Sequence, residues 1–261
     1  MKSRLSIAGI VLLTAVLLFS ATARADTRSF VGEIEGNAPE VRLFRWLVDR
    51  VSPEAALMVL DGPVEKDGKV RHLYFEAVGP SLDGFKVASV KVETVFNDFG
   101  PLEFWGEGGP ADIDEIVMGY FDAVITDSDV NDFLNGLVVE DDSGRWEGLS
   151  VEFSSSGISA KGYYRMEDPV SMRIKVDLQG ELALKEGREI WIDRYVFKIN
   201  NDDQSSVVEK ALRDVQPIVD MEDFVFPVHL KTLDLRKGRM RLATRVIPAS
   251  FDGISLSYKA R

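Results

Sequence analysis

The sequence predicts an α+β protein whose central feature is a long antiparallel β-sheet covered by two short amphipathic helices. Three observations support this fold class. Residues 170–184 alternate between apolar and polar side chains, as expected for a strand with one buried and one solvated face. Turn-like segments separate further alternating stretches from residue 149 onward, which favours hairpins. Residues 37–51 and 206–215 each carry a single apolar stripe at helical spacing.

The long strand at residues 170–184 organises the predicted sheet. Its even positions are apolar apart from Gly180, and its odd positions are almost all polar. A two-residue turn at Gln179 and Gly180 would place Leu178 opposite Glu181 on one face, so the pattern indicates one continuous strand with a bend or bulge at Gly180. Such a strand spans roughly 50 Å at about 3.3 Å per residue. Its apolar face therefore needs a long apolar cover.

The first half of the chain is expected to begin with a helix at residues 37–51. Asn37 is the expected cap, proline fits the first turn, and Glu40 occupies the acidic position of a capping box. The apolar stripe of this helix is Val41, Phe44, Leu47, Val48 and Val51. Strands are then expected at residues 55–60, 70–78 and 85–96.

Residues 100–110 contain Trp105 and four glycines and are expected to form a loop. Residues 106–109 do not match a phosphate-binding loop, because that chemistry needs a strand before the glycines and a helix directly after them. We therefore expect no nucleotide site here.

A strand at residues 115–125 is expected to lead into a helix that ends at Leu137. Thr126 can cap this helix, and Asp129 lies in its first turn, where a negative charge favours the helix dipole. Asp127, Asp129 and Asn131 also imitate the start of a calcium loop. The imitation fails at position six, which is aspartate instead of glycine, and at position twelve, which is valine instead of glutamate. Capping is therefore the preferred interpretation.

The second half is predicted to be a series of hairpins. The first turns at residues 154–157 and joins a strand containing Val151 and Phe153 to one containing Ile158. A three-residue turn at residues 186–188 follows the long strand. It should pair Lys185 with Glu189, Leu184 with Ile190, and Leu182 with Ile192. Trp191, Phe197 and Ile199 have the opposite phase, so we expect this partner strand to be covered on both faces.

The chain then shows a second helix signal and a closing hairpin. Residues 206–209 form a capping box, and the apolar stripe that follows is Val207, Val208, Ala211, Leu212 and Val215. In the closing hairpin, Leu233 and Leu235 should pair with Met240 and Leu242 across Lys237 and Gly238. A last strand is expected within residues 251–258.

The N-terminal segment predicts export. A positive start, an apolar run at residues 5–19 and a small-x-small site before Asp26 indicate a signal peptide of residues 1–25, cleaved after Ala25. An uncleaved membrane anchor is the alternative, although the apolar run is short for a span of about 20 residues. The sequence has no cysteine, which fits a periplasmic or secreted protein that is stabilised by its core without disulfides. Residues 26–261 are expected to form a single domain.

The charge balance excludes one class of partner. The whole chain carries a formal net charge of −12, and removal of Lys2, Arg4 and Arg24 with the signal leaves −15. Such a field repels phosphate backbones at long range, so nucleic-acid binding is not expected.

The motifs that carry catalysis are missing from the sequence. His72 and His229 are the two histidines, and neither lies in a metal-ligand spacing or beside a nucleophile motif. The acids at positions 112–115 and 141–142 could form carboxylate pairs, but a solvated face explains them better in a chain this acidic. The sequence therefore favours a protein that is not an enzyme and needs no cofactor.

Amphipathic sheet with two amphipathic helices leaves two interpretations open. Side chains can fill the volume as an ordinary core, or part of the volume can be left for acyl chains. A lipid chain of about sixteen carbons needs such a shelter in water, because burying hydrocarbon is worth roughly 0.8 kcal/mol per methylene.

The order of several marks in residues 112–245 resembles the LmeA-like family of secreted bacterial phospholipid-binding proteins. Residues 125–131 resemble the family's helix start "itd-x-dln". The strand with Gly180, Glu181 and Leu182, followed by residues 197–200, resembles its long hairpin ending in "ing". Residues 216–220 resemble its "NPi-x-d" segment, and residues 226–228 with the hairpin at Lys237 and Gly238 resemble its end. Gln216 and Asn201 depart from the family pattern, which has asparagine and glycine there.

The resemblance implies an α+β fold like that of tubular lipid-binding proteins, in which a long, strongly curved antiparallel sheet wraps around one or two amphipathic helices. It implies phospholipid binding in the cell envelope without a metal, nucleotide or catalytic residue. The partner would be a phospholipid or another acyl-chain lipid, with transient membrane contact during lipid transfer and an unknown protein partner.

We therefore expect acyl chains to be held between the long sheet and the helices, for lipid transfer or envelope biogenesis. The alternative is a non-catalytic scaffolding protein of the envelope that binds another protein through a sheet edge or its acidic face. A hydrolase ranks third. The candidate lipid-binding residues are Phe44, Leu47, Val48, Met172, Ile174, Val176, Leu178, Leu182, Leu184, Val208, Leu212 and Val215.

Overall fold

The computed structural model describes residues 27–82, 84–136, 140–141, 144–166, 171–204, 216–222, 226 and 228–261. The predicted signal peptide and the predicted helix at residues 206–215 lie outside these residues. The described chain is mostly β-strand, with two α-helices and one short 3₁₀ helix. Its strands pair antiparallel except for one parallel pair, β1 with β17. The predicted α+β class with antiparallel sheets is confirmed.

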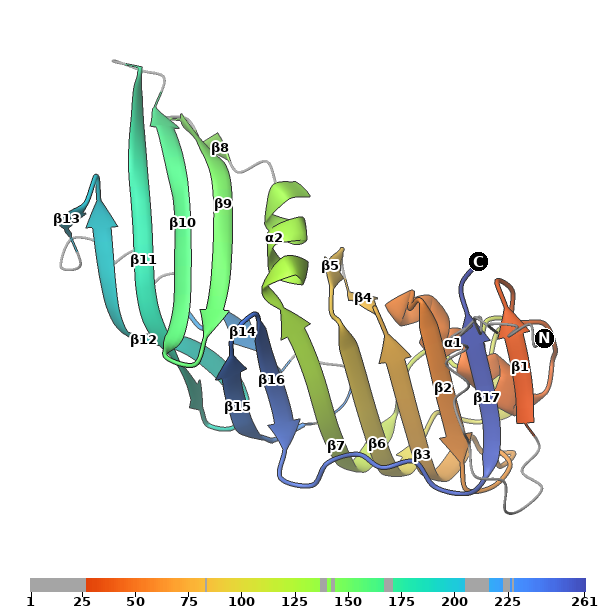
Figure 1. Ribbon diagram of the computed structural model, residues 1–261. Coiled ribbons are helices and arrows are strands. Elements are labelled where there is room, and N and C mark those ends of the chain that lie inside the picture. Colours follow the sequence, from red (N-terminus) through yellow and green to blue (C-terminus); the bar gives the residue numbers. More distant parts are fainter. Residues whose placement is uncertain are drawn as a thin grey trace, which may run out of the picture.

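An eight-stranded sheet contains both ends of the described chain. Its strand order is β1-β17-β2-β3-β6-β7-β16-β15. The strands are β1 (Thr27–Val31), β2 (Ala55–Leu60), β3 (Lys69–Val78), β6 (Ser89–Asp98), β7 (Glu115–Thr126), β15 (Leu230–Arg236), β16 (Arg239–Thr244) and β17 (Ile254–Lys259). Helix α1 (Pro39–Val51) packs on one face of this sheet, as Figure 1 shows.

A seven-stranded sheet contains the long strand. Its order is β13-β12-β11-β10-β9-β8, with β14 also paired to β12. The strands are β8 (Glu140–Asp141), β9 (Gly144–Ser154), β10 (Gly157–Met166), β11 (Met172–Lys185), β12 (Glu189–Ile199), β13 (Asp202–Asp203) and β14 (Val219–Asp220). The remaining elements are the small pair β4 (Ser81–Leu82) and β5 (Phe85–Lys86), the 3₁₀ helix η1 (Leu102–Phe104) and helix α2 (Asp127–Gly136).

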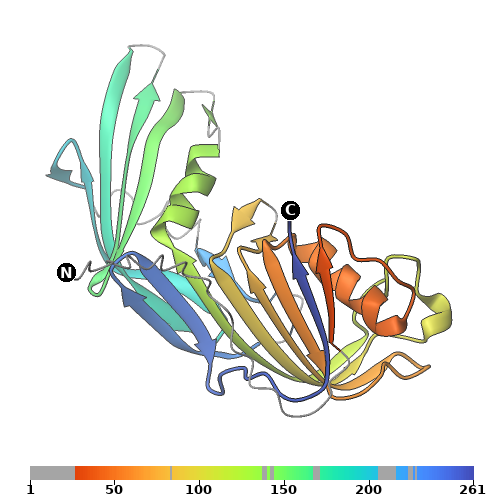
Figure 2. The same ribbon diagram turned by 45° about the vertical axis from the view of Figure 1, so that its right-hand side comes forward.

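Both sheets are open within the described residues, with β1 and β15 as the outer strands of one and β13 and β8 of the other. The seven-stranded sheet rises from the β15–β16 end of the eight-stranded sheet, and α2 stands at the junction beside β9 (Figures 1 and 2). The two sheets therefore form one elongated arrangement that places β11 far from α1.

Backbone hydrogen bonds join the two sheets at both ends of strand β15. The Leu230 N–H donates to the Gly187 carbonyl in the β11–β12 turn, at 2.6 Å. The Gly238 N–H donates to the Phe153 carbonyl at the end of β9, at 3.0 Å, and the Gly238 carbonyl accepts from the Asp127 N–H at the start of α2. The β15–β16 hairpin is thus fixed across the lower half of β11 and β12.

Helix α1 begins at Pro39, two residues later than the predicted cap. Asn37 as the cap is wrong: Ala38 occupies this position, and no side chain caps the helix there. Glu40 does not form the predicted capping box, because its buried carboxylate accepts the Val64 N–H at 3.1 Å. The tertiary contact to Val64 thus replaces a local one.

Helix α2 begins as the sequence predicts. The Thr126 hydroxyl accepts the Asp129 N–H at 3.1 Å, and the Asp129 carboxylate accepts the Thr126 N–H at 2.9 Å. This reciprocal pair satisfies two helix-terminal donors. Capping is therefore confirmed as the role of Thr126 and of Asp129, which is one of the three residues that imitate a calcium loop.

The predicted hairpins are confirmed in register. Leu184 lies opposite Ile190 and Leu182 opposite Ile192, and the closing hairpin pairs Leu233 with Leu242 and Leu235 with Met240. The predicted strand at residues 85–96 is instead divided into β5 and β6, and the final strand begins at Ile254. Among the described residues, no helix is both long and apolar enough to cross a membrane.

Candidate functional site

The long strand β11 carries a β-bulge at Gly180, and the extra residue belongs to its partner β12. Gln179 lies opposite Val196 and Glu181 opposite Asp193, so Arg194 and Tyr195 together oppose the single residue Gly180. Arg194 has φ of 42°, the left-handed geometry that a bulge residue can adopt. The bulge shifts the phase of β12 by one residue.

This phase shift corrects one prediction. Phe197 and Ile199 were expected on the face opposite to Ile190 and Ile192, with β12 covered on both faces. After the bulge, Leu178 lies opposite Phe197 and Val176 opposite Ile199, and directly paired residues share a sheet face. Phe197 and Ile199 therefore join the apolar face of β11, while Trp191 remains on the polar face opposite Ala183.

The upper half of the seven-stranded sheet thus presents a continuous apolar surface across four strands. We call it the distal apolar face. Its side chains are Trp146 of β9, Ala160, Tyr164 and Met166 of β10, Met172, Ile174, Val176 and Leu178 of β11, and Phe197 and Ile199 of β12. None of these ten side chains is buried: nine are half-buried and Met172 is 45% exposed. An apolar face of this kind in water is a candidate binding surface.

The lower half of the same face belongs to the hydrophobic core. Leu182 and Leu184 pack against core residues, and Ile190 is fully buried. The hairpin β15–β16 covers this half, with Leu233 and Leu235 also in contact with the core. Gly180 therefore divides the long strand into a packed lower half and a less covered upper half.

The candidate residues of α1 lie in a different part of the molecule. Phe44, Leu47 and Val48 are buried between α1 and the eight-stranded sheet. The void beneath this helix measures about 40 Å³, close to the roughly 30 Å³ that one water occupies in the liquid. The structure thus places these three residues in a filled core and separates them from Met172, Ile174, Val176 and Leu178. Val208, Leu212 and Val215 lie outside the described residues.

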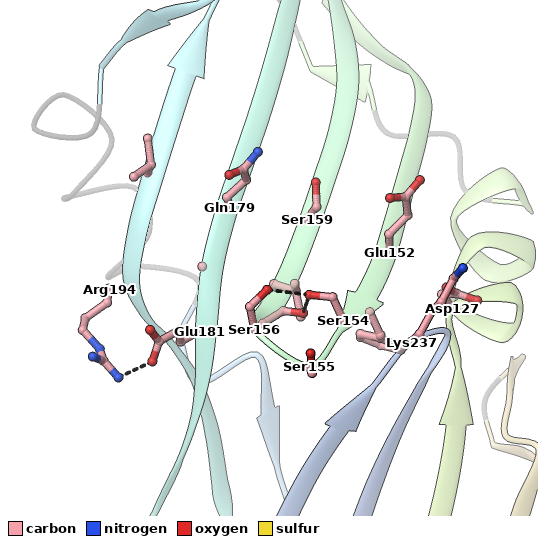
Figure 3. Close-up of a pocket in the computed structure, with 15 residues that line it drawn as sticks. Asp127, Glu152, Ser154, Ser155, Ser156, Ser159, Gln179, Glu181, Arg194 and Lys237 are labelled. Carbon is pink, nitrogen blue, oxygen red and sulfur yellow. Dashed lines mark hydrogen bonds and ion pairs between the residues drawn. The ribbon is translucent and has the colours of Figure 1, made fainter.

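The opposite face of the seven-stranded sheet is polar and contains an open hollow of about 960 Å³. Figure 3 shows Glu152, Ser159 and Gln179 side by side on neighbouring strands, and the pairing register places them directly opposite one another. Lys237 at the tip of the β15–β16 hairpin closes one side, and Arg194 forms an ion pair with Glu181 on the other. The sheet itself separates this hollow from the distal apolar face.

Two side-chain amides form hydrogen bonds with the backbone of β9 and β12, the two outer strands of the distal apolar face. Asn131 of α2 donates to the Val151 carbonyl and accepts the Val151 N–H, at 2.9 and 2.7 Å. Gln216 does the same for the backbone of Ile192 on β12, at 3.2 and 2.9 Å. Each amide therefore takes the place of a neighbouring strand for one residue. These contacts hold β9 and β12 at the two sides of the apolar face.

The glycine-rich loop after η1 is held by arginines of α1. Arg42 donates to the carbonyls of Trp105 and Gly106, and Arg45 donates to the carbonyl of Glu107. A Cβ at Gly109 would lie 2.7 Å from the Arg42 carbonyl oxygen, so the loop needs glycine to approach the helix. These contacts give the loop a structural role.

Two of the titratable residues that the sequence singled out, His72 and Asp112, have structural partners. His72 contacts Glu93 at 2.8 Å across β3 and β6 and stacks on Phe251. Asp112 lies 3.8 Å from Arg50 of α1. In the described part of the chain, no group of three or more His, Asp or Glu side chains could hold a metal ion.

Comparisons with known proteins give no assignment: no protein-family model matches the chain, and neither a curated protein nor a solved structure matches it significantly. The resemblance to LmeA-like proteins therefore stays a prediction.

Phe197, Ile199 and Tyr164 are members of the apolar surface that the sequence-based site omitted. The signal for the first two is present in β12, where the polar pair Asp193 and Arg194 interrupts an alternation that resumes one residue out of phase. Two adjacent polar residues between apolar residues of opposite phase are the pattern that a bulge produces.

Proposed function

We propose that the protein binds lipid and holds acyl chains against the distal apolar face. The observation that carries this proposal is the contrast between two apolar surfaces of one chain. Beneath α1, the packed side chains leave a void of only about 40 Å³. On the distal apolar face, by contrast, none of the ten side chains is buried. Apolar surface left in water costs roughly 25 cal/mol per Å², so a ligand that covers it gains that energy.

The dimensions of the face suit one acyl chain. From Met172 to Leu178, β11 extends about 20 Å, while one leaflet of a bilayer has a hydrocarbon thickness of about 15 Å. Three aromatic rings, those of Trp146, Tyr164 and Phe197, contribute broad apolar surfaces. The rings of Trp146 and Tyr164 lie 5.3 Å apart between centroids.

The predicted export signal and the resemblance to LmeA-like proteins agree with this function. In this proposal the protein is periplasmic or secreted, is not catalytic, and carries phospholipid in the envelope for transfer or biogenesis. Its fold is then a variant of the tubular lipid-binding type, in which the seven-stranded sheet supplies the lipid-binding wall.

Trp146 provides a direct test, because a brominated acyl chain quenches a tryptophan that it contacts. The probe is a brominated lysophospholipid below its critical micelle concentration. The proposal expects quenching of the native protein and loss of that quenching in Trp146→Phe. Trp191→Phe, on the polar face of the same sheet, is the matched control and should retain it. Absence of quenching, or quenching that survives Trp146→Phe, contradicts the proposal and favours the scaffolding alternative.

A further inference from the structure

Three arginines lie side by side on the polar face at the upper end of the seven-stranded sheet. Arg165 of β10 is directly opposite Arg145 of β9 and also directly opposite Arg173 of β11. We call these three residues the arginine row. Their side chains are 42, 44 and 54% exposed.

Such a row is unfavourable for the isolated sheet. Like charges at directly opposed positions of adjacent strands destabilise the pairing, and the chain as a whole is strongly acidic. Glu147 offsets part of the repulsion: its carboxylate lies 3.1, 3.5 and 3.8 Å from the Nε atoms of Arg145, Arg165 and Arg173. The carboxylate of Glu147 therefore neutralises one of the three guanidinium charges.

The guanidinium groups retain hydrogen-bonding capacity. The contacts of Arg145, Arg165 and Arg173 to Glu147 include one through each Nε. Each guanidinium has five N–H donors, more than a single shared carboxylate can accept from three arginines. Arg173 is also positioned by Tyr163, whose ring centroid is 3.7 Å from the guanidinium carbon. Planar guanidinium groups with available N–H donors are suited to phosphate oxygens.

The other face of the same sheet end carries side chains typical of a membrane interface. Met166 and Met172 pair with each other one residue beyond the arginine row, and Trp146 and Tyr164 pair one residue before it. Tryptophan and tyrosine concentrate at the level of lipid headgroups, and arginine extends to phosphates from apolar surroundings. The end of the sheet is therefore amphipathic, with arginines on one face and methionines and aromatic rings on the other.

We propose that this end of the seven-stranded sheet docks edge-on to a phospholipid bilayer, with the arginine row bound to lipid phosphates. Docking would bring Met172, at the upper end of the distal apolar face, to the bilayer surface, so that an acyl chain can pass directly between membrane and protein. This inference rests on the proposed function and adds the partner and the surface.

The attraction between the arginine row and a membrane must act at short range. In the backbone register, Glu140 of β8 lies opposite Arg145 of β9. In the sequence, Glu167 and Asp168 directly follow β10. These acids and the net charge oppose long-range attraction to an anionic membrane. We therefore expect binding to zwitterionic phosphatidylcholine vesicles as well as to vesicles that contain phosphatidylglycerol, and only weak dependence on salt.

Vesicle flotation of the full-length protein tests the docking. The double variant Arg165→Gln/Arg173→Gln should bind phosphatidylcholine vesicles about tenfold more weakly, because it loses two charge-assisted contacts. The double variant Arg71→Gln/Arg236→Gln is the matched control: both arginines are exposed ion-pair partners in the eight-stranded sheet. It should bind as the native protein does.

Thermal unfolding separates docking from a structural role. The row variant should keep or raise the melting temperature, since it removes like-charge pairs. Met172→Ser should also weaken flotation several-fold without lowering the melting temperature, because this side chain is 45% exposed.

Several results overturn the docking proposal. They are absence of vesicle binding by the native protein, equal binding by the row variant, a lower melting temperature with unchanged binding, and competition by inorganic phosphate alone, which would assign the row to soluble anions. Quenching of Trp146 by the brominated lysophospholipid uses no vesicle. If quenching persists while flotation fails, lipid binding stands and the docking surface does not.

Discussion

Leu178 of β11 lies directly opposite Phe197 of β12. The register at the turn between these strands, continued without a bulge, would instead place Leu178 opposite Val196. The change of register occurs at Gly180, where two residues of β12 oppose one of β11. Without it, Phe197 and Ile199 would lie on the polar face. The single extra residue therefore adds Phe197 and Ile199 of β12 to an apolar face that β9, β10 and β11 already form.

Gly180→Ala should destabilise the protein by about 1–3 kcal/mol, because overpacking forces neighbouring groups to move. A Cβ at this position would lie 2.8 Å from Ile192 Cγ2 and 3.3 Å from Tyr195 Cβ. Gly62→Ala is the control, since nothing lies within 4 Å of a Cβ there. Denaturant unfolding measures both variants, and an unchanged midpoint for Gly180→Ala would show that the bulge is loosely packed.

Ile190 and Leu178 should respond differently to truncation. Ile190 is fully buried, so Ile190→Ala should cost about 2–5 kcal/mol of unfolding free energy. Leu178 is half-buried and lies outside the described core, so Leu178→Ala should cost about 1 kcal/mol. Leu178→Ala should nevertheless reduce lysophospholipid binding, whereas equal and large losses of stability would place Leu178 in an ordinary core.

Asn131→Ala should loosen the edge of β9. The substitution leaves the N–H and C=O of Val151 without the amide, and an unsatisfied buried group costs about 1–3 kcal/mol. Asn135→Ala, an exposed position on the same helix, should change stability little. Hydrogen exchange of the Val151 amide is the sharper measurement, and protection that survives Asn131→Ala would argue against the bridging role.

Tyr74 should make stability fall at high pH. Burial raises the pKa of the Tyr74 phenol well above its ordinary value of 10.0, and its hydrogen bond to Glu76 adds to the shift. The folded state keeps the proton while the unfolded state loses it above pH 10, so the unfolding free energy should decline as the pH rises beyond that value. Tyr74→Phe should flatten this decline relative to the native protein and to Tyr258→Phe. An equal decline in all three proteins would rule out Tyr74 as the cause.

Local sequence patterns predicted the elements well where one face is buried. The strict alternation around Leu182 and Leu184 determined the register with Ile190 and Ile192, because a slip of one residue would expose every apolar side chain. Thr126 and Asp129 likewise predicted the start of α2, since both partners of that cap are local.

Tertiary contacts explain the predictions that were wrong. Glu40 has the right spacing for a capping box, but the buried N–H of Val64, distant in sequence, takes its carboxylate. The bulge at Arg194 depends on a backbone conformation with positive φ, which side-chain periodicity does not reveal directly.

The candidate site was predicted in part. Met172, Ile174, Val176 and Leu178 lie together on the distal apolar face, but Phe44, Leu47 and Val48 lie beneath α1 on the other sheet. The sequence assigns an apolar stripe to α1 but contains no local signal for which of two sheets it covers. That choice is made by packing against Phe75 and Val92 of β3 and β6.

Native mass spectrometry of the protein purified without detergent is the sharpest measurement of lipid binding. We expect one phospholipid bound per chain, and loss of that lipid in Ile174→Asn, whose side chain lies at the centre of the distal apolar face. Ser159→Asn, on the polar face of the neighbouring strand, should retain the lipid. A native protein that carries no lipid and takes up none from added phospholipid would contradict the proposed function.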